Sequence, residues 1–240
     1  MDYVLSTDNL VKSYGQARAL SGLSMHVPKG AIYGIVGRNG AGKTTLIRLI
    51  CGLQRPTSGT YSIYGREFTS RDIALSRRRM GAVVETPSIY LDMSARENLR
   101  QQYRVLGLPR VEGIYELALG GGRDFLILDE PVNGLDPEGI IEMRELILRL
   151  NRERQITVLI SSHILDELAR LATHYGFIDG GRMVREMSAA ELEAACRKSM
   201  RLEVTDTGAL ARVLDAMGAD YRILSEDTAD VYERLTVSQL

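Results

Sequence analysis

The chain has 240 residues, of which 45% are hydrophobic and 25% are charged, and this suits one soluble globular domain with a small appendage. Its 30 basic and 31 acidic side chains nearly cancel, which argues against a nucleic-acid partner bound through bulk electrostatics. No apolar run approaches the ~20 residues of a membrane-spanning helix, and the N-terminus does not resemble a signal peptide. We therefore expect a cytoplasmic protein that reaches a membrane only through another protein.

The two cysteines, Cys51 and Cys196, lie far apart in the sequence and have no metal-ligand spacing. This usage indicates a reducing compartment. We expect both thiols to be buried as small apolar side chains.

Strand-like runs alternate with helix-like runs through most of the sequence. The apolar run at 31–37 leads into an amphipathic helical pattern, and the same alternation returns between 125 and 173. Repeated strand–helix–strand units predict an α/β fold with a mostly parallel sheet. The runs at 3–15 and 59–65 are short and bounded by turns, so we expect flanking antiparallel strands there.

The sequence pattern predicts a main domain at 1–187 and a small C-terminal α/β extension at 188–240. Within the main domain, residues from about 86 to 124 have a helical pattern and are expected to form a helical subdomain. The extension has no motif that suggests its role, and packing at the surface is the simplest expectation for it.

The segment Gly37–Thr45 reads GRNGAGKTT and matches the pattern GxxxxGK(S/T) between an expected strand and an expected helix. Glycines let such a loop curl so that its N–H groups point inward, and the helix N-terminus adds positive charge. The alternative, a glycine-rich turn with a chance lysine, does not explain this context. The expected nucleotide-binding residues of the loop are Gly37, Asn39, Gly40, Ala41, Gly42, Lys43, Thr44 and Thr45. Lys43 would pair with the β- and γ-phosphates, and the Thr44 hydroxyl would bind Mg²⁺.

Two acids end the apolar run FLILDE at 125–130. Asp129 would hold the Mg²⁺ ion through a water molecule, and Glu130 would polarise the water that attacks the nucleotide. The alternative is that the acids merely end a strand. The phosphate loop upstream favours the catalytic interpretation.

The motifs GRNGAGKTT, LDEP, NGLDP and SSH, in this order, resemble those of the ATPase subunit of an ABC transporter. The resemblance covers roughly residues 2–188 and implies a P-loop NTPase core. It also implies that Tyr14 stacks on adenine, that Asp136 faces a partner ATPase subunit, and that His163 contacts the γ-phosphate. Taken alone, a histidine after a strand is more often structural, and its place in this series of motifs favours the functional role.

At the position where the family usually has a glutamine, the segment GAVVETP at 81–87 has Glu85. In this respect, the sequence is similar to ATPases that serve peptide-antibiotic, lantibiotic and multidrug exporters. The resemblance implies that Glu85 reaches Mg²⁺ or the attacking water. A simple strand-end acid remains the alternative.

The glycine cluster at 119–122 lies about two residues before the strand at 125, so the helix that follows the family's LSGGQ-type signature does not fit between them. Only 86 positions (129 − 43) separate Lys43 from Asp129, which is short for the family. The break is expected near Glu116–Leu117, and the helical subdomain is expected to be incomplete. Either the protein lacks this segment, or the sequence omits an internal stretch; we favour the omission.

The leading functional hypothesis is an ATP-hydrolysing subunit that uses ATP and Mg²⁺ to power a separate integral-membrane permease at the inner face of the cell membrane. It would work as a homodimer or with a paired ATPase subunit, and Glu85 favours export of an antimicrobial peptide or drug. One alternative is a soluble regulatory ABC protein acting without transport. Another is a fragment without the signature that binds ATP and does not hydrolyse it.

Overall fold

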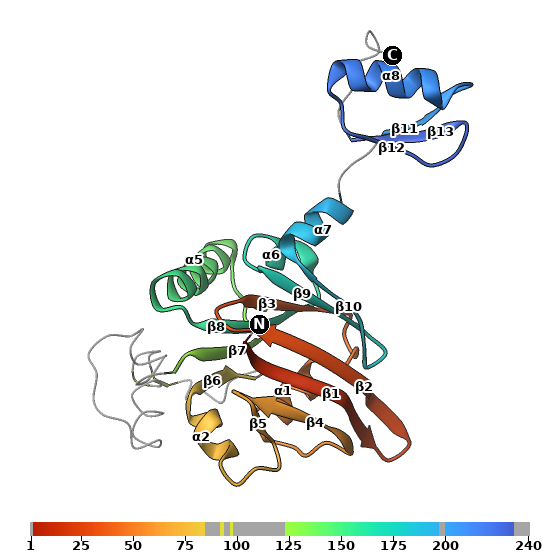
Figure 1. The fold of residues 1–240 in the computed structure, drawn as a ribbon. Helices are drawn as coiled ribbons and strands as arrows, with labels where there is room; N and C mark the ends of the chain where they lie inside the picture. The colour runs from red at the N-terminus through yellow and green to blue at the C-terminus, as the bar shows by residue number, and fades with distance from the viewer. Residues whose placement is uncertain (1, 85–91, 94–96, 98–122, 197–199, 233–240) are drawn as a thin grey trace. The chain divides into compact units, whose positions relative to one another are not determined.

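The computed structural model describes residues 2–84, 92–93, 97, 123–196 and 200–232. The chain forms two compact units, Met1–Ala189 and Ala190–Leu240 (Figure 1). Glu85, the glycine cluster at 119–122 and the expected break at Glu116–Leu117 lie outside the described residues, as does nearly all of the expected helical subdomain.

A central sheet and a smaller antiparallel sheet form the first unit. The strands described in this unit are β1 (Tyr3–Tyr14), β2 (Ala17–Pro28), β3 (Ile32–Val36), β4 (Ser58–Ile63), β5 (Arg66–Glu67), β6 (Met80–Val83), β7 (Phe125–Asp129), β8 (Thr157–Ser162), β9 (His174–Asp179) and β10 (Arg182–Ser188). The helices described there are α1 (Lys43–Ile50), α2 (Ile73–Arg78), α5 (Pro137–Arg154) and α6 (Leu165–Ala169).

The central sheet has the strand order β10-β9-β3-β8-β7-β6, in which every pair is parallel except β10 with β9. The second sheet has the order β2-β1-β4-β5 and is antiparallel throughout. This arrangement confirms the expected α/β fold with a mostly parallel sheet and flanking antiparallel strands. The long strand β2 and the hairpin β9–β10 were not anticipated from the sequence.

The register of the central sheet brings three strand ends together at one edge. Val36 of β3 pairs with Ser162 of β8, and Asp129 of β7 pairs with Ser161. Because the strands are parallel, the segments that follow β3, β7 and β8 all leave from this edge. These segments contain the phosphate loop after β3, Glu130 after β7 and His163 after β8.

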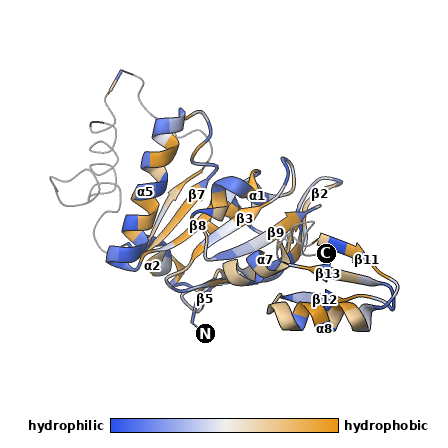
Figure 2. Cartoon of the chain, turned by 90° about the horizontal axis from the view of Figure 1, so that it is seen from above, coloured by the Kyte–Doolittle hydropathy of each residue, from blue (hydrophilic) through white to orange (hydrophobic). Residues whose placement is uncertain are grey.

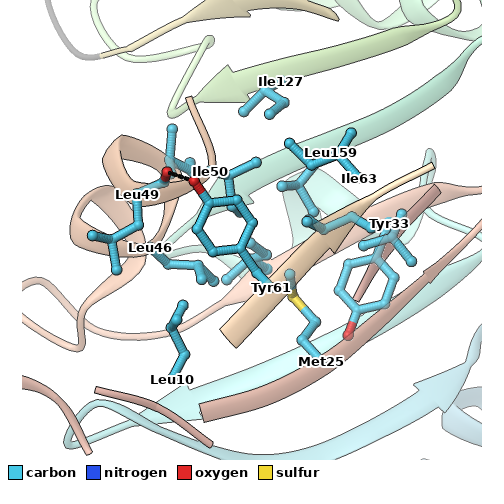
Figure 3. Close-up of a cluster of buried hydrophobic side chains, with 14 of the residues drawn as sticks. Leu10, Met25, Tyr33, Leu46, Leu49, Ile50, Tyr61, Ile63, Ile127 and Leu159 are labelled. Atoms are coloured by element: carbon cyan, nitrogen blue, oxygen red, sulfur yellow. Dashed lines mark hydrogen bonds between the residues drawn. The ribbon is translucent and has the colours of Figure 1, made fainter. Parts of the chain in front are cut away.

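The main hydrophobic core lies between the two sheets and includes α1. Figure 3 shows Leu46, Leu49 and Ile50 of α1 packed near Tyr61, Ile127 and Leu159. The Tyr61 hydroxyl is buried without loss of hydrogen bonding, because it donates to the Leu49 carbonyl at 2.8 Å. On the hydropathy scale, apolar colour dominates β7 and β8, whereas α5 alternates between polar and apolar (Figure 2). This alternation is the pattern of a helix that covers one face of the sheet.

The second unit contains helices and a three-stranded antiparallel sheet with the order β11-β13-β12. Its elements are α7 (Ala189–Ala195), β11 (Met200–Glu203), α8 (Thr207–Met217), β12 (Tyr221–Ile223) and β13 (Thr228–Val231). Leu214 of α8 and Val231 of β13 form a small core with Ala219. The sequence did not predict β13, and Cys196, which was expected to be buried, is exposed.

Candidate functional site

The phosphate loop connects the end of β3 to the first residue of α1. Gly42 has a φ of 108°, a conformation that side chains with a Cβ rarely adopt. A Cβ at Gly42 would also lie 2.7 Å from the Ala19 carbonyl oxygen of β2. The glycine is therefore required both by the turn into the helix and by the close approach of β2.

A small cavity of about 160 Å³ lies in front of this loop at the N-terminus of α1. It is lined by Ala19, Asn39, Gly40, Gly42, Lys43, Thr44, Thr45 and Glu130. Six of these are expected nucleotide-binding residues, and they meet at a helix N-terminus, where backbone N–H groups attract anions. The remaining loop residues act through their backbone: Gly37 accepts a hydrogen bond from Lys43, and Ala41 accepts one from Gly181.

Lys43 is only 5% exposed, and its ammonium group makes three contacts. Its Nζ donates to the Gly37 carbonyl at 2.7 Å and to the Arg38 carbonyl at 3.3 Å, and it lies 3.1 Å from Glu130 Oε1. A buried charge requires such compensation. The two carbonyl contacts fix the ammonium group inside its own loop.

Asp129 is 4% exposed at the C-terminal end of β7. Its Oδ1 accepts a hydrogen bond of 2.6 Å from the Ser161 hydroxyl, whereas its Oδ2 is buried without a hydrogen-bond partner. An unpartnered buried carboxylate oxygen beside a phosphate-binding loop fits the oxygen chemistry that Mg²⁺ prefers. In the part of the chain that the structure describes, no group of three or more His, Cys, Asp or Glu side chains is placed to hold a metal, so other Mg²⁺ ligands would have to come from hydroxyls, water and phosphates.

Glu130 has a φ of 47°, a strained conformation for a residue other than glycine. Its N–H donates to Ser161 Oγ at 3.0 Å, and its two carboxylate oxygens have different partners. Oε1 faces Lys43, while Oε2 accepts from Asn133 Nδ2 at 2.5 Å and lies 3.1 Å from His163 Nδ1. Burial alone would raise the pKa of this carboxyl, but Lys43, Asn133 and His163 together hold the pKa below its usual value. The carboxylate is therefore kept ionised and aimed at the cavity.

Three expected site residues lie apart from this cluster or outside the described chain. Asp136 is exposed and caps α5, because its carboxylate accepts from the Gly139 N–H at 2.9 Å. Tyr14 ends β1, and its hydroxyl donates to Gln54. It is not among the residues that line the cavity. Glu85 lies outside the described residues.

Reading the sequence alone missed three residues of the site. Ser161 holds both Asp129 and the backbone of Glu130, Asn133 holds the Glu130 carboxylate, and Ala19 closes the cavity from β2. Ser161 lies in the motif SSH and Asn133 in the motif NGLDP, so the sequence contained a signal for both. Ala19 has no local signal, because its contact depends on the packing of β2 against the loop.

Comparison with known proteins shows which family the chain belongs to. The family described as ABC transporter matches residues 20–119. A bacitracin transport ATP-binding protein of Bacillus licheniformis is 36% identical over 266 positions, which cover 98% of this chain and 87% of that protein. A lantibiotic transport ATP-binding protein of Streptococcus pyogenes is 36% identical over 211 positions, covering 76% of this chain and 90% of that protein.

The chain belongs to the ABC transporter family. It is an ATP-binding subunit of a transporter and an ABC ATPase, and the resemblance inferred from its motifs is thereby confirmed. Solved structures agree on the fold. A Clostridium perfringens subunit of an ABC transporter complex aligns with a TM-score of 0.67 at 23% identity, over 91% of this chain and 97% of that one. An ATP-binding cassette bound to ADP and phosphate aligns with a TM-score of 0.63 at 20% identity, over 77% and 98%.

The alignment with the bacitracin transport protein also bears on chain length. It spans 266 positions, whereas this ABC ATPase has 240 residues, so at least 26 positions (266 − 240) of the relative have no counterpart here. The shortfall is consistent with the short spacing between Lys43 and Asp129.

Among the described residues, no helix is long and apolar enough to cross a membrane.

Proposed function

We propose that this ABC ATPase powers a separate integral-membrane permease that exports an antimicrobial peptide or drug. The observation that carries the proposal is the 36% identity to a bacitracin transport ATP-binding protein over nearly the whole chain. A relative named for daunorubicin and doxorubicin resistance, from Streptomyces peucetius, is 30% identical over 94% of the chain. The permease would hold the chain at the inner face of the cell membrane, and a second ATPase subunit, identical or paired, would face Asp136.

ATP would bind with its phosphates in the cavity and its base at Tyr14. Lys43 and the loop N–H groups would bind the β- and γ-phosphates. Thr44 and Asp129 would hold Mg²⁺, with Glu85 as a further candidate from the sequence. When bound there, Mg²⁺ would neutralise part of the negative charge of the phosphates. The burial of Lys43, the unpartnered Asp129 oxygen and the motifs support these assignments.

Hydrolysis would use the ionised Glu130 carboxylate as the proton acceptor. The oxygen of a water molecule attacks the γ-phosphorus, the bond from that phosphorus to the bridging oxygen breaks, and the water proton passes to Glu130. ADP and inorganic phosphate are the products. His163 would contact the γ-phosphate. Its Nδ1 lies 3.1 Å from Glu130 Oε2, so the two side chains are neighbours.

The test is drug sensitivity in the host cell. A strain without this chain should become more sensitive to bacitracin or to a lantibiotic, and the intact chain, but not Lys43→Ala, should restore resistance. The chain should also copurify with a polytopic membrane protein. Unchanged sensitivity to both compounds, together with copurification with ribosomes or DNA, would favour the regulatory alternative and contradict the export proposal.

A further inference from the structure

The turn between β1 and β2 lies beside the phosphate cavity. Tyr14 is the last residue of β1 and pairs with Ala17, the first residue of β2. Two residues further along β2, Ala19 lines the cavity. Tyr14 and the cavity are therefore at the same end of this hairpin, although Tyr14 does not line the cavity itself.

Two side chains hold the Tyr14 ring from different directions. The Tyr14 hydroxyl donates to the Gln54 amide oxygen in the loop that follows α1. The Lys12 ammonium lies 5.1 Å from the ring centroid, over one face of the ring. Lys12 Nζ also donates to the Arg55 carbonyl at 2.9 Å, so it is fixed by the same loop.

The backbone adds to this attachment. The Ser13 N–H donates to Thr57 Oγ1 at 3.0 Å, and the Thr57 N–H donates to the Val11 carbonyl at 2.8 Å. The loop thus ties the end of β1 to the C-terminal side of α1, the helix that begins with Lys43. Tyr14 nevertheless remains 45% exposed, which leaves ring surface for a ligand.

We propose that Lys12 and Gln54 are positioning residues that hold the Tyr14 ring ready to stack on the nucleotide base. This inference rests on the proposed function, since it takes Tyr14 as the residue that stacks on the base. A ring that is fixed before binding loses less conformational freedom when the base arrives. Lys12 occupies one face, so the base takes the open surface.

A purely structural role of Lys12 and Gln54 would produce a different pattern of ligand affinities. If Lys12 and Gln54 only fastened the hairpin, their loss would weaken every ligand of the site equally or would weaken none. A positioning role affects only ligands that carry a base. ADP and pyrophosphate form the matched pair of probes, because both present two phosphates and only ADP has adenine.

The experiment is calorimetric titration of the full chain with ADP and with pyrophosphate, each with Mg²⁺. Tyr14→Ala should weaken ADP binding about tenfold, because the loss of base–aromatic stacking lowers affinity by roughly this factor. Lys12→Met and Gln54→Ala should each weaken ADP about threefold. Pyrophosphate affinity should stay unchanged in all three variants, and Lys12→Arg should restore ADP affinity. Lys29→Met, which alters an exposed side chain just after the other end of β2, serves as the control.

A double-mutant cycle sharpens the result. In the Tyr14→Phe background the hydroxyl is gone, so Gln54→Ala should have no further effect on ADP. The inference is overturned if Lys12→Met and Gln54→Ala bind ADP as the wild type does, or if ADP and pyrophosphate weaken by the same factor. A wild-type chain that binds neither probe would overturn the proposed function itself, and this inference with it.

Discussion

The Lys43 ammonium lies 3.1 Å from the Glu130 carboxylate, although the two residues are 87 positions (130 − 43) apart in the chain. Lys43 is 5% exposed and the Glu130 side chain is 20% exposed, so the pair is largely shielded from water. A phosphate that approaches Lys43 must replace this carboxylate, and it is repelled by the same negative charge. Glu130 therefore competes with the nucleotide in the empty chain.

The first prediction concerns this competition. Glu130→Gln removes the charge of the side chain and keeps its shape, so the affinity for ADP should rise roughly fivefold. This factor corresponds to the loss of an ion pair worth about 1 kcal/mol in the empty chain. ADP is used so that hydrolysis does not alter the reading. Calorimetric titration measures the effect, and Glu138→Gln, an exposed acid at the start of α5, is the control. Weaker binding in Glu130→Gln would show that the carboxylate helps to hold the nucleotide.

The second prediction concerns the unpartnered oxygen of Asp129. Asp129→Asn keeps the size of the side chain and one acceptor oxygen, but it removes the negative charge that would attract Mg²⁺. The gain in nucleotide affinity that Mg²⁺ produces in the wild type should fall by about tenfold. Titration with and without EDTA measures that gain. If Asp129→Asn retains the full Mg²⁺ effect, the ion is held elsewhere.

The third prediction concerns acid stability. Asp124, directly before β7, accepts hydrogen bonds from Arg79 and Tyr64, and the Arg79 guanidinium lies 3.7 Å from the Tyr64 ring centroid. Burial would raise the pKa of Asp124, but these partners lower it. Because the folded pKa is the lower one, the stabilisation is complete above the unfolded pKa of about 4 and is lost as pH falls through the folded pKa.

Asp124→Asn should therefore reduce the free energy of unfolding near pH 7, and the difference from the wild type should shrink below about pH 4. Urea unfolding at several pH values measures this difference. Asp72→Asn, an exposed acid before α2, is the control and should show little change at any pH. A difference that stays constant down to pH 2 would mean that the Asp124 charge is not the cause.

The fourth prediction concerns the thiols. Burial raises the pKa of Cys51 to about 11, while Cys196 is exposed. Thiolates are the reactive species, so at pH 8 only Cys196 should react quickly with a thiol reagent. Mass spectrometry of the labelled protein should show one modification, and none in Cys196→Ser. Rapid labelling of Cys51 in the folded chain would contradict its partly buried environment.

The sequence predicted the strands β3, β7 and β8 of the central sheet, because each is an apolar run with polar residues at its end. Those ends define the site, since parallel strands deliver their final residues to one edge. The sequence could not predict the Lys43–Glu130 contact or the unpartnered oxygen of Asp129. Both depend on side-chain packing between segments that are distant along the chain.

Other misses have separate physical causes. The strand β2 contains Ser, Gly and His among its apolar residues, so its pattern is weak. The strand β13 is a run of four residues that includes Asp230, which pairs with Arg201 across the sheet. Cys196 was expected to be buried because cysteine usually is, but it follows a helix without buried residues. In each case the neighbours in space decide the outcome.

The fifth prediction concerns the missing positions. The 240 residues have a mass of 26.6 kDa, or about 0.11 kDa each, so 26 further residues would add roughly 3 kDa. We expect an intact mass about 3 kDa or more above 26.6 kDa, which would support the presence of a segment that the 240 residues omit. A mass of 26.6 kDa would mean a true deletion, and ATP binding without efficient hydrolysis would then be expected.

The most direct test of the nucleotide site is the affinity of the purified chain for MgATP, measured by calorimetry for the wild type, Lys43→Ala and Lys29→Ala. Lys43 is the buried cation of the phosphate loop, whereas Lys29 is exposed in the turn that follows β2. We expect Lys43→Ala to weaken MgATP by at least about a hundredfold, as for the loss of a charge-assisted phosphate contact in a shielded site, and Lys29→Ala to leave it unchanged. Equal affinity in the wild type and Lys43→Ala would contradict nucleotide binding at this loop.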